Sequence, residues 1–186
     1  MNYYWLTEHS NKSITPLTED FDPVELLKIM RLKRTLDFGC GFGRLSPAFS
    51  PSDYLGLDMS ASRINSARKL YPNYSFTVLA GSKYFDTLLF YTVAVHLTDE
   101  EFIEVIDRFP NDRIIIIEVI GRKYRRNEGE PAVYNREIDE YSTMLKGYNL
   151  HAKLEGLRYK EKPYYHLTVL DFRANYSNLF SRAKDE

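Results

Sequence analysis

The feature of this chain that most restricts its fold is a glycine-rich turn at the end of a short apolar run. Residues 36–44 read LDFGCGFGR. The run closes on Asp37, and glycines follow at alternate positions: Gly39, Gly41 and Gly43. Because glycine lacks a Cβ and tolerates positive φ, such a turn lets the backbone come close to a ligand. It can also direct the free N–H groups of a following helix at that ligand. The motif predicts a nucleotide-like cofactor.

The spacing of the glycines discriminates between cofactors. A dinucleotide fingerprint has the pattern G-x-G-x-x-G, in which the third glycine packs the helix against the strand. Arg44 occupies that position here, and the glycines run G-x-G-x-G after an acidic residue. This Asp-x-Gly-x-Gly-x-Gly pattern resembles motif I of the class I S-adenosylmethionine (SAM)-dependent methyltransferases. The resemblance implies that Asp37 helps to hold the ammonium group of SAM. It also implies that the turn, Cys40 included, accommodates the methionine moiety and the ribose.

A second acidic residue follows the next apolar run. Residues 54–60 read YLGLDMS, and the run closes on Asp58. A carboxylate at the tip of the neighbouring strand can accept hydrogen bonds from both ribose hydroxyls. The stretch resembles the second strand and following helix of the same family, which assigns Asp58 to the ribose and adds Met59 to the cofactor site. The alternative is that Asp58 only caps the helix. We predict Ser60 as the N-cap residue of this helix.

Composition and charge exclude several other classes of protein. The chain has 186 residues, a net charge of −1 and one cysteine. No overall basic field therefore indicates nucleic acid, and no internal disulfide can form, as is usual in a reducing compartment. We interpret Cys40 as a small space-filling residue. The N-terminus lacks the features of a signal peptide, and no apolar run approaches the ~20 residues that span a bilayer. We predict a cytoplasmic protein.

Strands and helices alternate along the chain. Apolar patterning predicts five strands, at about 34–38, 54–58, 75–79, 86–93 and 113–120. The last contains IIIIEVI, a run so apolar that it predicts a central parallel strand covered on both faces. Helices are predicted where capping signals precede apolar periodicity. They begin at Asp22-Pro23, near Arg44, Leu45 and Ala48, at Ser60 (with Ile64, Ala67 and Leu70 on the buried face), at Thr98, and at Arg136. The last runs to Lys146, and Gly147 is its expected C-cap glycine. The connection between the third and fourth strands is too short for a helix. Two further strands, 149–159 and 164–173, form a hairpin around 160–163.

This order of elements predicts an α/β fold. Strand–helix alternation favours a parallel sheet with right-handed crossovers, and the C-terminal hairpin requires one antiparallel strand. The family resemblance, which covers residues 23–173, implies the same architecture: a three-layer αβα sandwich around a seven-stranded, mostly parallel sheet. We expect one domain over residues 1–186, with an N-terminal arm (1–22), a substrate-side loop (121–135) and a C-terminal tail (174–186).

One part of the cofactor site departs from the family pattern. Many members carry an acidic residue just after the third strand, where it meets the amino group of adenine. The corresponding stretch here, residues 79–83, reads LAGSK and contains no acid. We expect backbone groups of Ala80 and Gly81, or the hydroxyl of Ser82, to take its place.

Candidates for the chemical step follow the fourth and fifth strands, because ligands of open parallel sheets bind beyond the carboxyl ends of the strands. Tyr91 and His96 follow the fourth strand, and His96 is the leading candidate for a base or a substrate contact. The alternative is that His96 only packs near the next helix. Glu118 lies within an apolar run, where a carboxylate needs a partner or a wet cleft. It either belongs to the site or forms a structural ion pair.

A basic loop follows the fifth strand. Its candidate substrate contacts are Arg122, Tyr124 and Arg125, which would suit an anionic substrate. We prefer the alternative of a solvated loop whose charges are balanced by acidic residues, namely Glu128, Glu130 and Glu137. An aromatic N-terminal segment, Tyr3, Tyr4 and Trp5, could cover the cofactor as a lid.

These patterns predict a SAM-dependent methyltransferase that uses SAM, releases S-adenosylhomocysteine (SAH) and needs no metal. The sequence lacks the Asn-Pro-Pro-Tyr and Asp-Pro-Pro-Tyr tetrapeptides of DNA amino-methyltransferases, so a small-molecule acceptor, methylated on O or N, is favoured. One alternative is an RNA or protein methyltransferase that uses the basic loop at 122–126. Another is a non-catalytic SAM-binding partner subunit. A nicotinamide dehydrogenase is a remote fourth hypothesis. The sequence does not define the oligomeric state.

Overall fold

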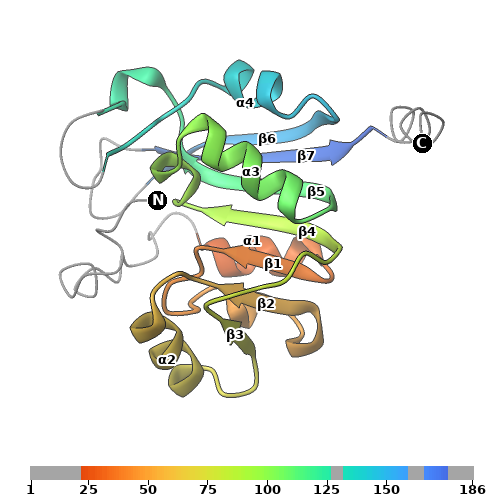
Figure 1. The fold of residues 1–186 in the computed structure, drawn as a ribbon. Coiled ribbons are helices and arrows are strands. Elements are labelled where there is room, and N and C mark those ends of the chain that lie inside the picture. The colour runs from red at the N-terminus through yellow and green to blue at the C-terminus, as the bar shows by residue number, and fades with distance from the viewer. Residues whose placement is uncertain (1–21, 127–131, 159–165, 176–186) are drawn as a thin grey trace.

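A computed structural model describes residues 22–126, 132–158 and 166–175. They form a seven-stranded sheet with the strand order β3-β2-β1-β4-β5-β7-β6 (Figure 1). The strands are β1 (Thr35–Phe38), β2 (Tyr54–Leu57), β3 (Ser75–Thr77), β4 (Phe85–Tyr91), β5 (Asn111–Val119), β6 (Tyr148–Arg158) and β7 (His166–Ala174). The first five strands pair in parallel, whereas β7 is antiparallel to both β5 and β6. The predicted sheet and its antiparallel hairpin are therefore confirmed.

Helices cover both faces of the sheet. α1 (Pro23–Met30) and α2 (Ala61–Leu70) pack on one face, while α3 (Asp99–Arg108) and α4 (Ile138–Met144) pack on the other, in front of the sheet in Figure 1. Each face has its own core. Alternate residues of β5 supply the two cores, so that Ile115 and Ile117 join one and Ile114 and Ile116 join the other. All four isoleucine side chains are fully buried. This is the three-layer arrangement that the sequence predicts.

The run at 113–120 was expected to form a central parallel strand. β5 is buried on both faces, but only its β4 edge is parallel, because β7 lies antiparallel along the other edge. The central strand is β4, which stands between β1 and β5. Burial on both faces therefore identified an interior strand without giving the direction of its neighbours.

The predicted helix starts are confirmed at three places where a side chain caps the first turn. Asp22 accepts a hydrogen bond from the Val24 N–H at the start of α1. Ser60 caps α2, and Thr98 and Glu101 form a capping box at the start of α3. Such caps satisfy backbone N–H groups that have no partner within the helix.

Two local predictions in this part of the chain were wrong. Leu70, assigned to the buried face of α2, is 59% exposed, because it lies at the end of the helix beyond the sheet. The helix expected after Arg44 is only a 3-10 turn, Ser46–Ala48. A second 3-10 turn follows at Pro51, and this proline holds Ser50 in extended conformation, with ψ of 140°. Prolines therefore divide this segment into short turns.

Helix α4 also ends earlier than expected. Its C-cap residue is Leu145, which is buried, and the chain turns there so that the N–H of Tyr148 donates to the carbonyl of Leu145. Gly147 is not among the residues with positive φ, so it is not the C-cap glycine. The early turn brings the chain directly into β6.

The connection between β3 and β4 contains no helix, as predicted. This short connection leaves apolar side chains uncovered: Val78 is 47% exposed and Leu79 is 73% exposed. Both lie beside the carboxyl end of β3.

The glycine turn makes a prediction about stability. Gly43 has φ of +74°, and a Cβ on it would lie 2.5 Å from Cε1 of Phe76. We expect Gly43→Ala to lower the free energy of unfolding by about 2–4 kcal/mol, since it combines left-handed strain with overpacking. Chemical denaturation measures this. Gly147→Ala, whose Cβ would meet no atom within 4 Å, is the control, and an equal effect of the two variants would contradict the prediction.

Candidate cofactor and acceptor site

A cavity of about 930 Å³ opens at the carboxyl ends of the parallel strands. Ten of the predicted site residues line it: Asp37, Gly39, Cys40, Gly41, Asp58, Met59, Tyr91, His96, Glu118 and Tyr124. The remaining predicted residues do not line it: Gly43, Gly81, Ser82, Arg122 and Arg125. The strand order β2-β1-β4-β5 places the cavity-lining side chains side by side along the carboxyl edge of the sheet. Asp58 and Asp37 lie toward one side, and Glu118 lies toward the other.

The glycine turn is tied to the end of β2. The N–H groups of Gly39 and Cys40 donate to the carbonyl of Leu57, at 2.7 Å and 3.0 Å. The N–H of Gly41 donates to the Asp58 carboxylate at 2.9 Å. A Cβ on Gly41 would meet no atom within 4 Å, whereas one on Gly39 would lie 2.5 Å from Cγ2 of Val93. The turn is thus packed on the protein side at Gly39 and open at Gly41.

Asp37 is a buried carboxylate at the tip of β1. Its side chain accepts a hydrogen bond of 2.7 Å from the hydroxyl of Tyr54. Burial raises the pKa of Asp37 to about 7, although the Tyr54 hydrogen bond and the charge of Arg44 oppose this shift. A cation that enters the cavity beside Asp37 would favour the ionised carboxylate. Arg44 itself lies over the ring of Tyr91, 4.6 Å from its centroid.

Asp58 is held in a fixed orientation at the tip of β2. One carboxylate oxygen accepts from Gly41, and the other accepts from the N–H of Ser60 at 2.8 Å. The guanidinium of Arg63 lies 3.8 Å away, and both side chains are largely buried. Because each carboxylate oxygen can accept more than one hydrogen bond, Asp58 keeps acceptor capacity for a diol. Its contact with the Ser60 N–H also caps the turn into α2. Asp58 therefore has the capping role of the alternative in addition to its place in the cavity.

The stretch after β3 forms an apolar wall of the same cavity. Val78, Leu79 and Ala80 line it. Two of the polar groups expected to replace the missing acid are engaged elsewhere. The carbonyl of Ala80 accepts from Arg108 at 3.0 Å, and the hydroxyl of Ser82 donates to the carbonyl of Arg108 at 2.8 Å. Arg108, which the sequence analysis did not select, thus links α3 to this wall.

Glu118 lies at the opposite side of the cavity and is only 1% exposed. Its Oε2 accepts a hydrogen bond of 3.0 Å from the N–H of Val95. Its Oε1 is buried and has no hydrogen-bond partner among the residues that the structure describes. Burial raises the pKa of Glu118 to about 8, and the charge of Arg136 and the Val95 hydrogen bond reduce this shift. Glu118 therefore lines the cavity and is not half of a closed ion pair within the described residues.

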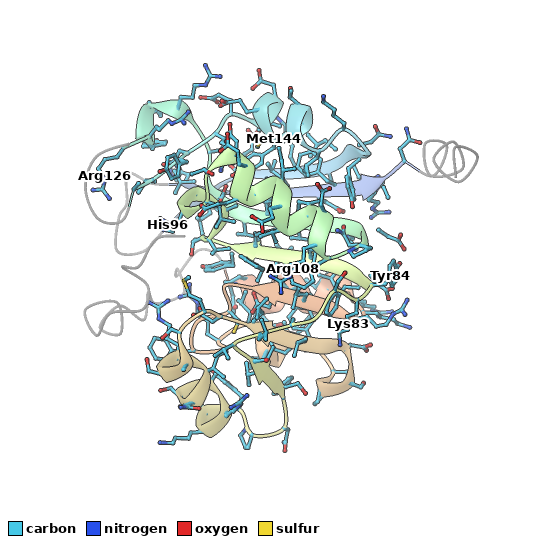
Figure 2. All side chains as sticks on the ribbon, in the orientation of Figure 1. Lys83, Tyr84, His96, Arg108, Arg126 and Met144 are labelled. Carbon is cyan, nitrogen blue, oxygen red and sulfur yellow. The ribbon has the colours of Figure 1, made fainter. Side chains whose placement is uncertain are left out.

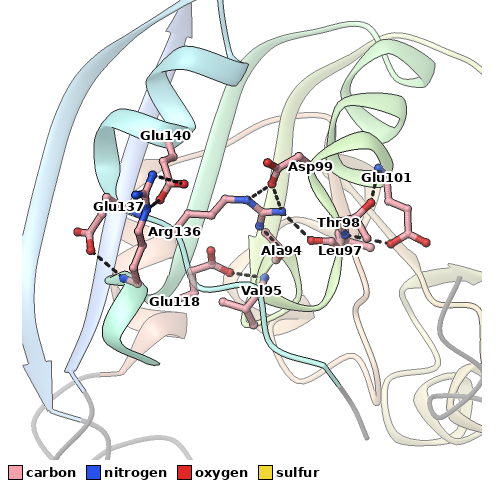
Figure 3. Close-up of polar contacts among 11 residues, drawn as sticks. Ala94, Val95, Leu97, Thr98, Asp99, Glu101, Glu118, Arg136, Glu137 and Glu140 are labelled. Carbon is pink, nitrogen blue, oxygen red and sulfur yellow. Dashed lines mark hydrogen bonds and ion pairs between the residues drawn. The ribbon is translucent and has the colours of Figure 1, made fainter. Parts of the chain in front are cut away.

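Arg136 organises the segment above this carboxylate (Figure 3). Its Nε donates to Asp99 at 2.9 Å, and its two terminal nitrogens donate to the carbonyls of Ala94 and Leu97, at 2.9 Å and 2.7 Å. These contacts fix the 3-10 turn Ala94–His96 that follows β4. Sequence reasoning missed Arg136, because the residue stood at the start of a predicted helix, where an arginine is usually exposed.

The 3-10 turn carries His96. Figure 2 shows His96 and Arg126 at the carboxyl end of the parallel strands, whereas Lys83 and Tyr84 lie at the opposite end. Nδ1 of His96 lies 3.1 Å from the carbonyl of Ala132. A carbonyl only accepts, so Nδ1 carries the proton and Nε2 carries the lone pair. Burial lowers the pKa of His96, against the effect of the Ala132 hydrogen bond.

The backbone just before this turn is strained. Thr92 has φ of 53°, an uncommon value for a threonine, and its N–H donates to the carbonyl of Ile117 at 2.9 Å. Strain of this kind is often found where a chain holds functional groups. Here it redirects the chain from β4 across the end of β5.

The basic loop divides into two parts. Arg122 forms an ion pair with Glu140 at 2.9 Å, and its N–H donates to Glu137 at 2.7 Å. Arg125 stacks on the ring of Tyr134. These contacts fit the interpretation of a loop with balanced charges. The other predicted partners, Glu128 and Glu130, and the aromatic segment Tyr3–Trp5 lie outside the described residues.

Within residues 22–126, 132–158 and 166–175, no His, Cys, Asp and Glu side chains form a group of three or more that could hold a metal ion. In the same part of the chain, no helix is both long and apolar enough to cross a bilayer.

The raised pKa of Glu118 makes the stability of the protein depend on pH. Between its ordinary value of 4.5 and about 8, the folded chain keeps a proton that the unfolded chain releases, so this residue lowers stability as pH rises. Glutamine does not titrate. We expect Glu118→Gln to gain stability relative to the parent from pH 5 to 8, by up to about 1.4 kcal/mol per pH unit. Urea denaturation at each pH tests this, and parallel curves would contradict it.

The fold resembles that of solved methyltransferases, although no protein-family model matches the chain and no curated protein matches its sequence. The magnesium protoporphyrin IX methyltransferase of Synechocystis PCC 6803 with bound SAM is 21% identical, has a TM-score of 0.59, and aligns over 82% of this chain and 76% of its own. The 1,6-didemethyltoxoflavin-N1-methyltransferase of Burkholderia thailandensis is 16% identical, has a TM-score of 0.66, and aligns over 90% and 83%.

The same fold also occurs in a protein described by another reaction. A [4+2]-cyclase is 13% identical, has a TM-score of 0.62, and aligns over 88% of this chain and 84% of its own. The cavity at the carboxyl ends of the strands lies where open α/β sheets bind their ligands. The chain therefore has the fold of the class I SAM-dependent methyltransferases.

Proposed function

We propose that this protein is a SAM-dependent methyltransferase that acts on an O or N atom of a small molecule. The observation that carries the proposal is the pair of buried carboxylates, Asp37 and Asp58, at the tips of the adjacent strands β1 and β2. They flank a glycine turn that is open toward the same cavity at Gly41. The spacing of these residues predicts a SAM site, and the fold supports it.

Each part of the cofactor has a matching part of the site. Asp37 would hold the ammonium group, because a buried carboxylate gains most from a cationic partner. Asp58 would accept from the ribose hydroxyls, in the orientation that Gly41 and Ser60 impose. The apolar wall of Val78–Ala80 would cover the adenine ring. SAM supplies a methyl group bound to a positively charged sulfur.

The remaining residues would position the acceptor and move its proton. Methyl transfer is an in-line displacement, which depends chiefly on positioning. Tyr91 and Glu118, at the ends of β4 and β5, would contact the acceptor. His96 would take the proton of an acceptor that must lose one, since its Nε2 carries the lone pair and its low pKa keeps it neutral.

Two solved neighbours support a small-molecule acceptor, because their described substrates are a porphyrin and a toxoflavin precursor. The RNA and protein alternatives depended on the basic loop. Arg122 is paired with Glu140, which removes one of the charges on which these alternatives depended, while Tyr124 and Arg126 line the cavity. The non-catalytic alternative predicts cofactor binding without turnover.

Ligand-dependent thermal stability tests the cofactor. At a ligand concentration 100-fold above Kd, binding adds about 2.7 kcal/mol, which raises Tm by roughly 5–10 °C for a domain of this size. We expect this shift with SAM and SAH but not with NAD, and we expect Asp58→Ala to lose it. Glu155→Gln, an exposed change on β6, is the control for altered charge. A parent protein that shows no shift with SAM or SAH would contradict the proposal.

His96 makes a separate prediction about turnover. For an acceptor that must lose a proton, we expect His96→Gln to lower kcat by about 10²–10⁴-fold and to leave the Kd for SAH unchanged. The parent should lose activity as pH falls through the pKa of His96, and the variant should lack that limb. Formation of SAH against pH measures both. A variant with the parent's profile would exclude His96 as the base.

A further inference from the structure

The unpartnered oxygen of Glu118 indicates what the cavity accepts. Oε2 is fixed by Val95, and Oε1 is buried without a partner. Figure 3 shows the carboxyl group between Val95 and Arg136, on the side of the network that faces away from Glu140. Glu118 also lines the cavity. A buried acceptor without a donor is costly, so a ligand that supplies a donor at this point gains directly from the contact.

Arg136 does not supply that donor. All three of its guanidinium nitrogens are used, by Asp99 and by the carbonyls of Ala94 and Leu97. Arg136 therefore moderates the charge of Glu118 from a distance but forms no hydrogen bond with it. A cation bound beside Glu118 would favour its ionised form, in which Oε1 is an acceptor and part of the charge is unmatched on the cavity side.

Asn135 adds a second acceptor at the same end of the cavity. It is 2% exposed, lines the cavity, and directs its side-chain nitrogen at the carbonyl of Val119, the residue after Glu118. Because a carbonyl only accepts, this contact fixes the orientation of the amide and leaves its oxygen as the remaining acceptor. Glu118 and Asn135 thus both line this end of the cavity and carry side-chain acceptor oxygens.

We propose that the methyl acceptor is an amine whose N–H groups donate to Oε1 of Glu118 and to the side-chain oxygen of Asn135. An ammonium group carries several donors and a positive charge, whereas a hydroxyl carries one donor and no charge. Two acceptors, one of them a carboxylate, match an ammonium group better than a hydroxyl. Carboxylate and phosphate acceptors would face repulsion from Glu118. This proposal deepens the proposed function and rests on it.

The chemistry balances without a further reactant. An ammonium group that binds first gives one proton to His96 or to water, which restores its lone pair. The nitrogen then attacks the methyl carbon, the C–S bond breaks, and its electron pair stays on sulfur. The products are a methylammonium ion and SAH. A positive charge passes from sulfur to nitrogen, so that Glu118 faces a cation when substrate arrives and when product leaves.

The test compares two probes with the same ring but opposite head groups. Benzylamine and benzoate are titrated against the full chain in the presence of saturating SAH, and binding is followed by ligand-observed NMR. Isothermal titration with SAH on the same samples reports the cofactor site separately. Glu118→Gln keeps the size of the side chain. Its amide oxygen can still accept from Val95, which turns the amide nitrogen, a donor, toward the cavity.

We expect benzylamine to bind at least about tenfold more tightly than benzoate, and Glu118→Gln to abolish or reverse this preference with the Kd for SAH unchanged. Glu155→Gln, which alters an equal charge on exposed β6, should behave as the parent. Equal binding of the two probes, no binding of benzylamine, or a preference that survives in Glu118→Gln would overturn the proposal while SAH still binds. Failure to bind SAH would instead refute the proposed function.

Discussion

The hydrogen bonds that join the turn after β1 to the end of β2 hold the rest of the site in place. Two N–H groups of the turn donate to the carbonyl of Leu57, and a third donates to Asp58. Glycine is required where the turn meets other parts of the core, because a side chain at position 39 would strike Val93 and one at position 43 would strike Phe76. The same contacts that close the turn therefore orient a carboxylate and leave an open surface at Gly41.

The cost of burying carboxylates shapes both sides of the cavity. Asp37 and Glu118 are almost fully buried, and burial raises the pKa of each to near or above neutrality. Within the described part of the chain neither forms a direct ion pair, and their hydrogen bonds come from the neutral donors of Tyr54 and Val95. A protein that keeps two such groups in one cavity gives up stability there. A cationic ligand at each position would offset that cost, and a methyl donor and an amine would both be cations.

Much of this architecture could be predicted because it depends on local patterns. Alternating strands and helices, the capping residues Asp22, Ser60 and Thr98, and the short link before β4 each left a signal within a few residues. The errors arose where residues outside the local pattern determine where a helix ends or which way a strand runs. Prolines at 47 and 51 prevented the helix after the glycine turn, and the buried Leu145 ended α4 early. The direction of the strands beside β5 depends on the hairpin, which burial alone does not reveal.

The site shows the same division between local and distant signals. Asp37, Asp58, His96 and Glu118 could be selected because each follows or ends an apolar run at the same edge of the sheet. Arg136 and Asn135 could not, since their partners lie 16 or more positions earlier in the sequence. Yet the contacts of Arg136 determine which hydrogen bonds Glu118 receives. Its three guanidinium nitrogens bind Asp99 and the carbonyls of Ala94 and Leu97, which fixes the turn that carries His96. Oε1 of Glu118 is left without a donor among the described residues. An arginine paired with Glu118 would occupy the place that we propose for an amine, whereas one that holds the backbone leaves that place to a ligand.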